Sequence, residues 1–168
     1  MSVDLKEYFE AEKLLSRHPS WIPADRNSLR LSVPLDIDGI TTAGLDFCAY
    51  AMTELPDEEV VVQLQYKPAK GRSFPFCRIE WRPIRDHSNN GKGPPELKLL
   101  KFRSTHIHPF DLNSDPSNGR MRGHNLPIAV PIKKEPKDWK EFLDLTGKEF
   151  RISNVDWVPL PPWQPRIR

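Results

Sequence analysis

Residues 60–66, Val-Val-Val-Gln-Leu-Gln-Tyr, decide the fold class, because their side chains follow a period of two. Val60, Val62, Leu64 and Tyr66 would share one face of an extended chain, and both glutamines would lie on the other. Such alternation is typical of a strand with one buried face. A similar period predicts neighbouring strands over residues 28–35, 45–52 and 74–82.

The second half of the chain is harder to divide, because prolines and turn-forming residues interrupt it. Residues 83–95 and 109–123 are rich in turn formers and predict two exposed loops. Between these loops, residues 97–107 predict a fifth strand. Residues 125–132 are apolar but contain two prolines, which indicates a short edge strand. A last strand is predicted over residues 150–157.

Two segments carry helical signals. Residues 4–16 begin with Asp4 and Glu7 at the spacing of a capping box and predict a first helix. Residues 135–146 predict a second helix, and Gly147 follows it as a stop signal. The predicted fold class is α+β: a curved, mainly antiparallel sheet of about six to seven strands, with an N-terminal helix and a helix near the C-terminus.

Length and composition exclude several classes of protein. The chain has 168 residues, 38% hydrophobic and 29% charged, which suits one globular domain rather than a disordered chain. No apolar run reaches the ~20 residues of a membrane helix, and acidic residues interrupt the N-terminus where a signal peptide is apolar. Two cysteines are too few for a disulfide scaffold or a cysteine zinc cage. These features predict a cytoplasmic protein without a membrane partner.

Proline accounts for 18 of the 168 residues and is dense at the C-terminal end. We therefore predict a single α+β domain over residues 1–158 and a proline-rich extended tail over residues 159–168. The tail could dock on a protein partner, because a polyproline segment loses little entropy on binding. Alternatively, it wraps the domain and buries the tryptophans at this end of the chain, Trp157 and Trp163.

The segment Arg103-Ser-Thr-His-Ile-His-Pro-Phe-Asp111 is the strongest candidate for chemistry. In an extended chain His106 and His108 point to the same side, whereas Ile107 points into the core. Paired imidazoles can bind a divalent metal such as zinc, or act as acid and base near neutral pH. The metal interpretation uses His106, His108, His124 and Asp111. The catalytic interpretation uses His106, His108, His124 and Arg103. An exposed, solvated histidine pair at a strand end is the alternative to both.

Basic residues concentrate in the middle of the chain, although the formal net charge is only +2. Between Arg72 and Arg103, eight cations and three anions give a local excess of +5. Cations beside histidines suit metal-free RNA cleavage, in which an acid and a base move protons and the cations hold the phosphate. The candidate nucleic-acid-binding residues are Arg78, Arg82, Arg85, Lys101, Arg120 and Arg122. The same cations could instead cover the wet face of a sheet and protect its edges.

The run from Arg103 to His124, with paired histidines, a polar loop and a later histidine, resembles the C-terminal part of small bacterial toxin proteins of the TumE type. This resemblance implies a toxin–antitoxin setting, action on RNA and an antitoxin-like protein partner. Three functions stay open. They are a bacterial-type binding or regulatory protein with a histidine-centred surface site, an RNA-directed hydrolase that uses the histidines with Arg103, and a divalent-metal-binding domain.

Overall fold

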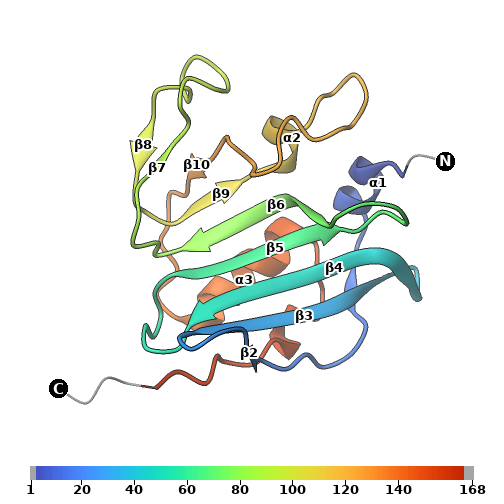
Figure 1. Ribbon diagram of the computed structural model, residues 1–168, viewed down its shortest axis with the longest axis vertical. Helices are drawn as coiled ribbons and strands as arrows, with labels where there is room; N and C mark the ends of the chain where they lie inside the picture. The colour runs from blue at the N-terminus through green and yellow to red at the C-terminus, as the bar shows by residue number, and fades with distance from the viewer. Residues whose placement is uncertain (1–2, 165–168) are drawn as a thin grey trace.

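An antiparallel sheet forms the body of the protein in the computed structural model, which describes residues 3–164 (Figure 1). Its strands are β1 (Leu14–Leu15), β2 (Ile22–Pro23), β3 (Ser28–Ile37), β4 (Ile40–Met52), β5 (Val60–Tyr66), β6 (Phe74–Trp81), β9 (His106–His108) and β10 (Val130–Pro131). The strand order is β1-β3-β4-β5-β6-β9-β10, and β2 also pairs with β3. Every strand pair runs antiparallel. The predicted α+β class with an antiparallel sheet is confirmed.

The period of two separates a core face of the sheet from an open face. Val62 on β5 pairs with Ile79 on β6, and both side chains are fully buried. Arg78 and Glu80 flank Ile79 along β6, so their side chains point to the opposite face. The sheet thus presents apolar residues to one layer and polar residues to the other.

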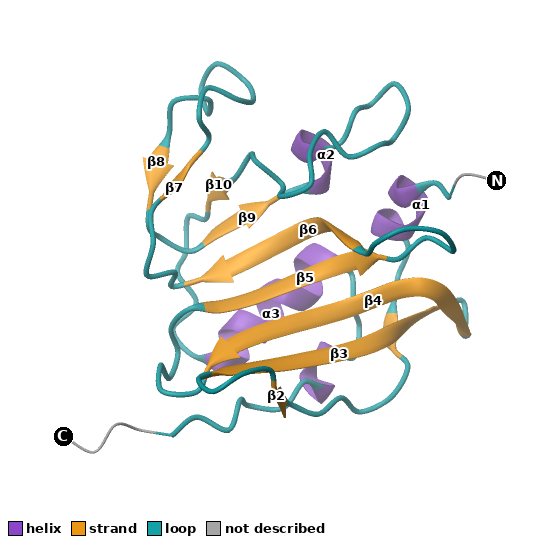
Figure 2. Cartoon of the chain, in the orientation of Figure 1, coloured by secondary structure: helices purple, strands orange, loops and turns teal. Residues whose placement is uncertain are grey.

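Helices α1 (Leu5–Glu10), α2 (Phe110–Asn113) and α3 (Trp139–Phe150) and the 3-10 helix η1 (Val155–Trp157) complete the fold. Figure 2 shows α3 lying across one face of the sheet. Phe142 of α3 stacks on Trp81 of β6 with 4.7 Å between ring centroids and 9° between ring planes. The helix near the C-terminus therefore closes the core over the apolar face.

Helix α3 continues through Gly147, where the sequence predicts its end, and stops at Arg151 in the left-handed region with φ of 54°. A Cβ on residue 147 would lie 2.7 Å from Cγ1 of Val155. Glycine is therefore required here by the close packing of η1 on α3, and it does not end the helix. Because the chain turns back at Arg151, the strand predicted over residues 150–157 is wrong, and η1 takes its place.

The strand predicted over residues 97–107 is also wrong, because the segment divides between two sheets. Pro94 accepts a backbone hydrogen bond from Leu97 in a turn. Then β8 (Lys101–Phe102) pairs with β7 (His87–Ser88) in a separate two-stranded sheet, and β9 returns to the main sheet. This β7–β8 ribbon uses part of the loop predicted over residues 83–95. The ribbon carries His87 on β7.

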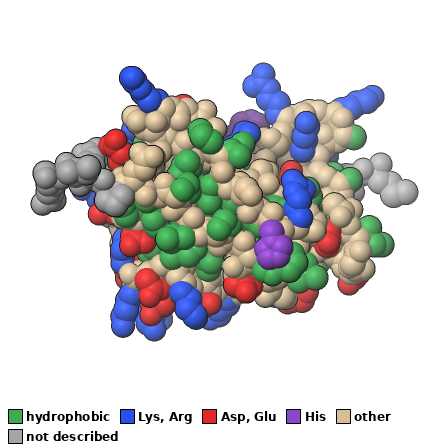
Figure 3. All heavy atoms as spheres, turned by 90° about the horizontal axis from the view of Figure 1, so that it is seen from below, with side chains coloured by type: hydrophobic (Ala, Val, Ile, Leu, Met, Phe, Trp, Pro, Cys, Tyr) green, Lys and Arg blue, Asp and Glu red, His purple; other side chains and the backbone are tan. Residues whose placement is uncertain are grey.

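The described part of the C-terminal tail wraps the domain. The indole nitrogen of Trp21 donates to the carbonyl of Pro159 at 2.8 Å. Trp163 packs edge-on against Trp139, with 5.9 Å between ring centroids. The side of the molecule seen in Figure 3 carries hydrophobic side chains among charged ones. The rest of the predicted tail, residues 165–168, lies outside the described residues.

The N-terminal helix ends at Glu10 instead of extending to residue 16, because the chain is extended at Ala11 and β1 then pairs with β3. Lys13 lies in this turn with only 1% of its surface exposed. Its ammonium group donates to the backbone carbonyls of Phe9 and Ala11. Burial lowers the pKa of Lys13 to about 8.

We expect Lys13 to make the free energy of unfolding rise with pH between about 8 and its ordinary pKa of 10.5. In this window the unfolded chain holds the Lys13 proton and the folded protein has released it, so unfolding takes up a proton. The contribution is at most about 1.4 kcal/mol per pH unit. Urea denaturation of the wild type and Lys13→Met across this range measures it, and the variant should lack this rise. Parallel pH dependences of the two proteins would contradict the assignment.

Candidate metal centre

The two histidines of the H-x-H motif lie side by side on the open face of the sheet. Pairing of β9 with β6 places His106 opposite Glu80 and His108 opposite Arg78. Ile107, between them, packs against the core. Solvent hardly reaches the two rings, since His106 is 0% and His108 2% exposed. The alternative of an exposed, solvated pair is therefore wrong.

A third histidine comes from the β7–β8 ribbon. The ribbon is fastened beside His87 by an ion pair between Asp86 and Arg103, 2.9 Å long. The His87 ring centroid lies 5.2 Å from that of His106 and 4.9 Å from that of His108. One ring nitrogen of each of the three histidines lies within 4.8 Å of the other two. The fold thus brings together imidazoles from two different sheets.

Backbone carbonyls fix the tautomers of the two β9 histidines. His106 Nδ1 donates to the carbonyl of Ser104 at 2.8 Å, and His108 Nδ1 donates to that of Leu126 at 2.6 Å. A carbonyl oxygen only accepts, so Nδ1 carries the hydrogen and Nε2 carries the free lone pair in each neutral ring. Both Nε2 atoms are buried and have no hydrogen-bond partner among the described residues. Two unprotonated nitrogens therefore face the centre of the cluster.

Asn89 orients the third ring. Its Oδ1 accepts from the backbone N–H of Ala129, while its Nδ2 donates to the carbonyls of Leu97 and Ala129. These bonds fix the direction of the amide, so the 2.8 Å contact between His87 Nε2 and Asn89 Oδ1 has His87 as the donor. In neutral His87 the lone pair is then on Nδ1. Such hydrogen bonds are the usual support of metal-binding histidines.

The charge state of the cluster favours a cation. Burial lowers the pKa of His106 to about 4 and also lowers the pKa of His87. Burial opposes ionisation of Glu80, but His108, His106 and Arg78 outweigh it and hold the pKa of this carboxyl below its ordinary value. The site therefore places a carboxylate that favours its ionised form beside His106 and His87, in which burial disfavours the protonated imidazole.

The position of Glu80 suits a fourth ligand. Its Oε1 lies 3.4 Å from Nε2 of His108, and its Oε2 lies 3.6 Å from Nε2 of His106. In a tetrahedral zinc site with bonds of ~2.0–2.1 Å, neighbouring ligand atoms are about 3.3–3.4 Å apart. The carboxylate already stands at nearly this separation. The three histidine nitrogens are spaced more widely, within 4.8 Å of one another.

A hollow of about 470 Å³ opens beside the cluster. Glu80, His87 and His108 contribute to its wall together with Arg78 and Lys92. Because three of the four candidate ligands line this hollow, an ion held by them would face it. A small molecule in the hollow could then reach the ion.

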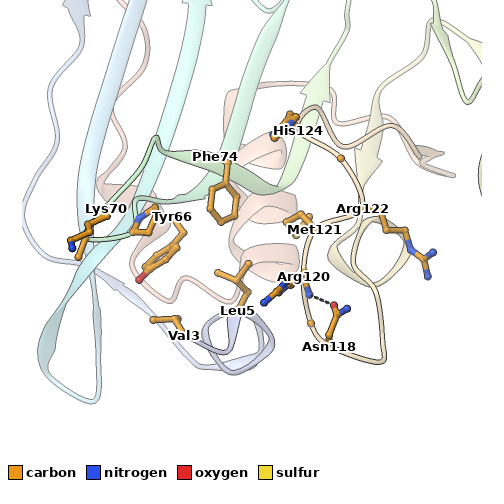
Figure 4. A pocket seen from close by; sticks show the side chains of 14 residues that line it. Val3, Leu5, Tyr66, Lys70, Phe74, Asn118, Arg120, Met121, Arg122 and His124 are labelled. Atoms are coloured by element: carbon orange, nitrogen blue, oxygen red, sulfur yellow. Dashed lines mark hydrogen bonds between the residues drawn. The ribbon is translucent and has the colours of Figure 1, made fainter. Parts of the chain in front are cut away.

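Two residues predicted from the sequence do not join the cluster. The groups of possible ligands found among the described residues contain neither His124 nor Asp111. His124 lines a separate hollow of about 760 Å³ with Tyr66 and Phe74 (Figure 4). Asp111 is exposed in the first turn of α2. The predicted grouping of His124 with the β9 histidines is corrected, and His87 takes its place.

The loop before His124 explains this difference. Ser114 and Met121 form an isolated antiparallel bridge, so the loop closes on itself. The backbone N–H of Arg122 also donates to the carbonyl of Asn113 at 2.8 Å. The chain reaches β9 only after His124, at Leu126, whose carbonyl accepts from His108, and His124 itself lines the other hollow. No residue pattern in this polar segment predicts the closure.

The basic candidates are spread over separate places. Arg78 lies beside the cluster, where its Nε donates to Gln63 at 3.1 Å. Arg82 lies 5.0 Å above the Trp81 ring and pairs with Glu135, which gives it a structural role. Lys101 pairs with Asp86, and Arg85 is exposed. Arg120 and Arg122 line the hollow of Figure 4.

The sequence analysis missed three residues of this site. His87 and Asn89 lie among turn formers, which predict only an exposed loop. Glu80 is one of several alternating charges on β6, which predict only a wet face. The alternation of side chains along the strands could have indicated Glu80, because Glu80 and the two β9 histidines lie on the same face of the sheet once β6 and β9 pair.

No family model, no curated protein and no solved structure matches this chain. Within residues 3–164, no helix is both long and apolar enough to cross a membrane. The TumE-type resemblance stays a prediction.

Proposed function

We propose that this protein binds a divalent transition-metal ion, with Zn²⁺ as the first choice, through His87, His106 and His108, with Glu80 as the fourth ligand. The observation that carries the proposal is the pair of buried Nε2 atoms of His106 and His108 on β9, which have no hydrogen-bond partner within residues 3–164. A buried polar atom without a partner costs free energy unless something else satisfies it. A metal ion would satisfy both atoms, and their Nδ1 hydrogen bonds already aim the lone pairs.

The set of donor atoms narrows the choice of metal. Imidazole nitrogens suit zinc, copper, iron and nickel, whereas Mg²⁺ and Ca²⁺ prefer oxygen ligands. Three histidines, with a carboxylate 3.4 and 3.6 Å from two of their nitrogens, favour zinc among these. Cys48 and Cys77 are free and buried and do not belong to the cluster, so thiolate ligation is not part of the proposal.

This proposal joins two of the functions predicted from the sequence, the histidine-centred binding protein and the metal-binding domain. RNA cleavage by His106, His108 and His124 stays a prediction, and so do an antitoxin-like protein partner and RNA binding. We also propose a cytoplasmic location, because two cysteines kept as free thiols are typical of a reducing compartment.

Titration of the metal-free full-length chain with Zn²⁺ and with Co²⁺ tests the proposal. We expect saturation at one equivalent of either ion. The visible spectrum of the cobalt form should indicate nitrogen and oxygen ligands, without the intense bands that thiolate ligands produce. A chain that binds neither ion stoichiometrically would refute the proposal.

A further inference from the structure

We infer that the hollow beside the histidine cluster binds a small phosphate-type dianion, one oxygen of which joins the four protein groups as a fifth ligand of the metal ion. This inference rests on the proposed function, because the metal supplies part of the attraction. The hollow shares His87, His108 and Glu80 with the cluster, so a molecule inside it would lie next to the bound metal ion. Its volume of about 470 Å³ leaves room for an organic group attached to the phosphate.

Charge determines the class of ligand. Asp86 also lines the hollow, but Arg103 at 2.9 Å and Lys101 at 3.6 Å already balance it. Glu80 is then the acid left to offset the metal ion, Arg78 and Lys92. With the metal bound, the wall carries an excess of about three positive charges, which favours a dianion over a monocarboxylate.

The two cations are positioned by the residues that build the site. The backbone N–H of Lys92 donates to the carbonyl of Asn89 at 2.9 Å, and Asn89 orients His87. Lys92 is exposed, and it takes part in no ion pair among residues 3–164. Arg78 is held through Nε by Gln63, and its Nη1 lies 3.9 Å from Oε1 of Glu80, so the N–H groups of Nη2 remain for an oxyanion.

The test uses the full-length chain loaded with Co²⁺, whose visible spectrum responds to a new ligand. Phenylphosphonate is titrated in as the dianion, with benzoate as the matched monoanion. We expect phenylphosphonate to change the spectrum with saturation and to bind at least about tenfold more tightly than benzoate. Lys92→Gln should weaken phenylphosphonate binding about tenfold, as for the loss of one charge-assisted hydrogen bond. Lys98→Gln is the control, because Lys98 lies in the same loop but does not line the hollow.

The outcomes separate the two proposals. If cobalt binds and phenylphosphonate leaves its spectrum unchanged, the anion site is refuted and the metal site stands. Equal affinity for both anions, or equal weakening by the two lysine variants, also overturns the inference, because the hollow would then not select a dianion. Failure of cobalt itself to bind refutes the proposed function and the inference together. Inorganic phosphate, added as a competitor, shows whether the phosphate group alone is recognised.

Discussion

Replacing His106 by alanine is expected to weaken Zn²⁺ binding by more than about 100-fold, beyond the 10- to 100-fold loss usual for residues that only support a ligand. His106 supplies one of the two buried, unpartnered nitrogens, and it contacts the other candidate ligands. The wild type should also gain thermal stability when zinc is added, since an ion that binds only the folded state stabilises it. The variant should lose most of that gain. Competition titration with a chelating dye and thermal denaturation with and without zinc measure both effects.

His124→Ala is the matched control. His124 was a candidate ligand on sequence grounds, but the fold places it in another hollow (Figure 4). Its removal should leave zinc affinity unchanged within error. If His124→Ala costs as much affinity as His106→Ala, the cluster built on His87 is wrong and the trio expected from the sequence is restored.

Trp81→Ala is expected to lower the free energy of unfolding by about 3–5 kcal/mol, the range for truncating a large buried aromatic. Trp81 is fully buried at the end of β6, stacks on Phe142 and donates its indole N–H to the carbonyl of Pro136 at 3.3 Å. The variant therefore loses packing on α3 and one buried hydrogen bond. Chemical denaturation followed by far-UV circular dichroism gives the difference.

Trp157→Ala provides the comparison for Trp81. Trp157 is 37% exposed and stacks on His18 at 3.9 Å. Its truncation should cost clearly less than that of Trp81, because much of its surface stays in water. Similar losses from the two tryptophans would mean that the interface between the sheet and α3 does not hold the core together.

The sequence predicts those parts of the fold in which polar and apolar residues alternate regularly along the chain. Residues 60–66 alternate so regularly that β5 follows from sequence alone, and the antiparallel class follows from the strands without helices between them. The end of α3 could not be predicted, because glycine is both a common helix stop and the residue that close packing requires. Only the position of Val155 against Gly147 distinguishes the two roles.

The site could be predicted only where its residues lie on one strand. The period of two places His106 and His108 together without any tertiary information. Glu80 and His87 join them through strand pairings and a ribbon that depend on long-range contacts. Asn89 is buried in a stretch of turn formers, and two of its hydrogen bonds are with Ala129, which is 40 residues away in sequence. Such long-range contacts cannot be predicted from the residues next to Asn89 in the sequence.

The small size of the β7–β8 ribbon has a consequence for the behaviour of the protein over time. Two strands of two residues cannot be stable in water unless they dock on something larger. The segment around His87 is then a subglobal opening unit, whose local unfolding costs less than global unfolding. A metal ion bound by both this segment and β9 would stabilise the closed state, and its removal would make opening easier. The concentration of free zinc would thereby set how often the segment opens to proteases and to hydrogen exchange.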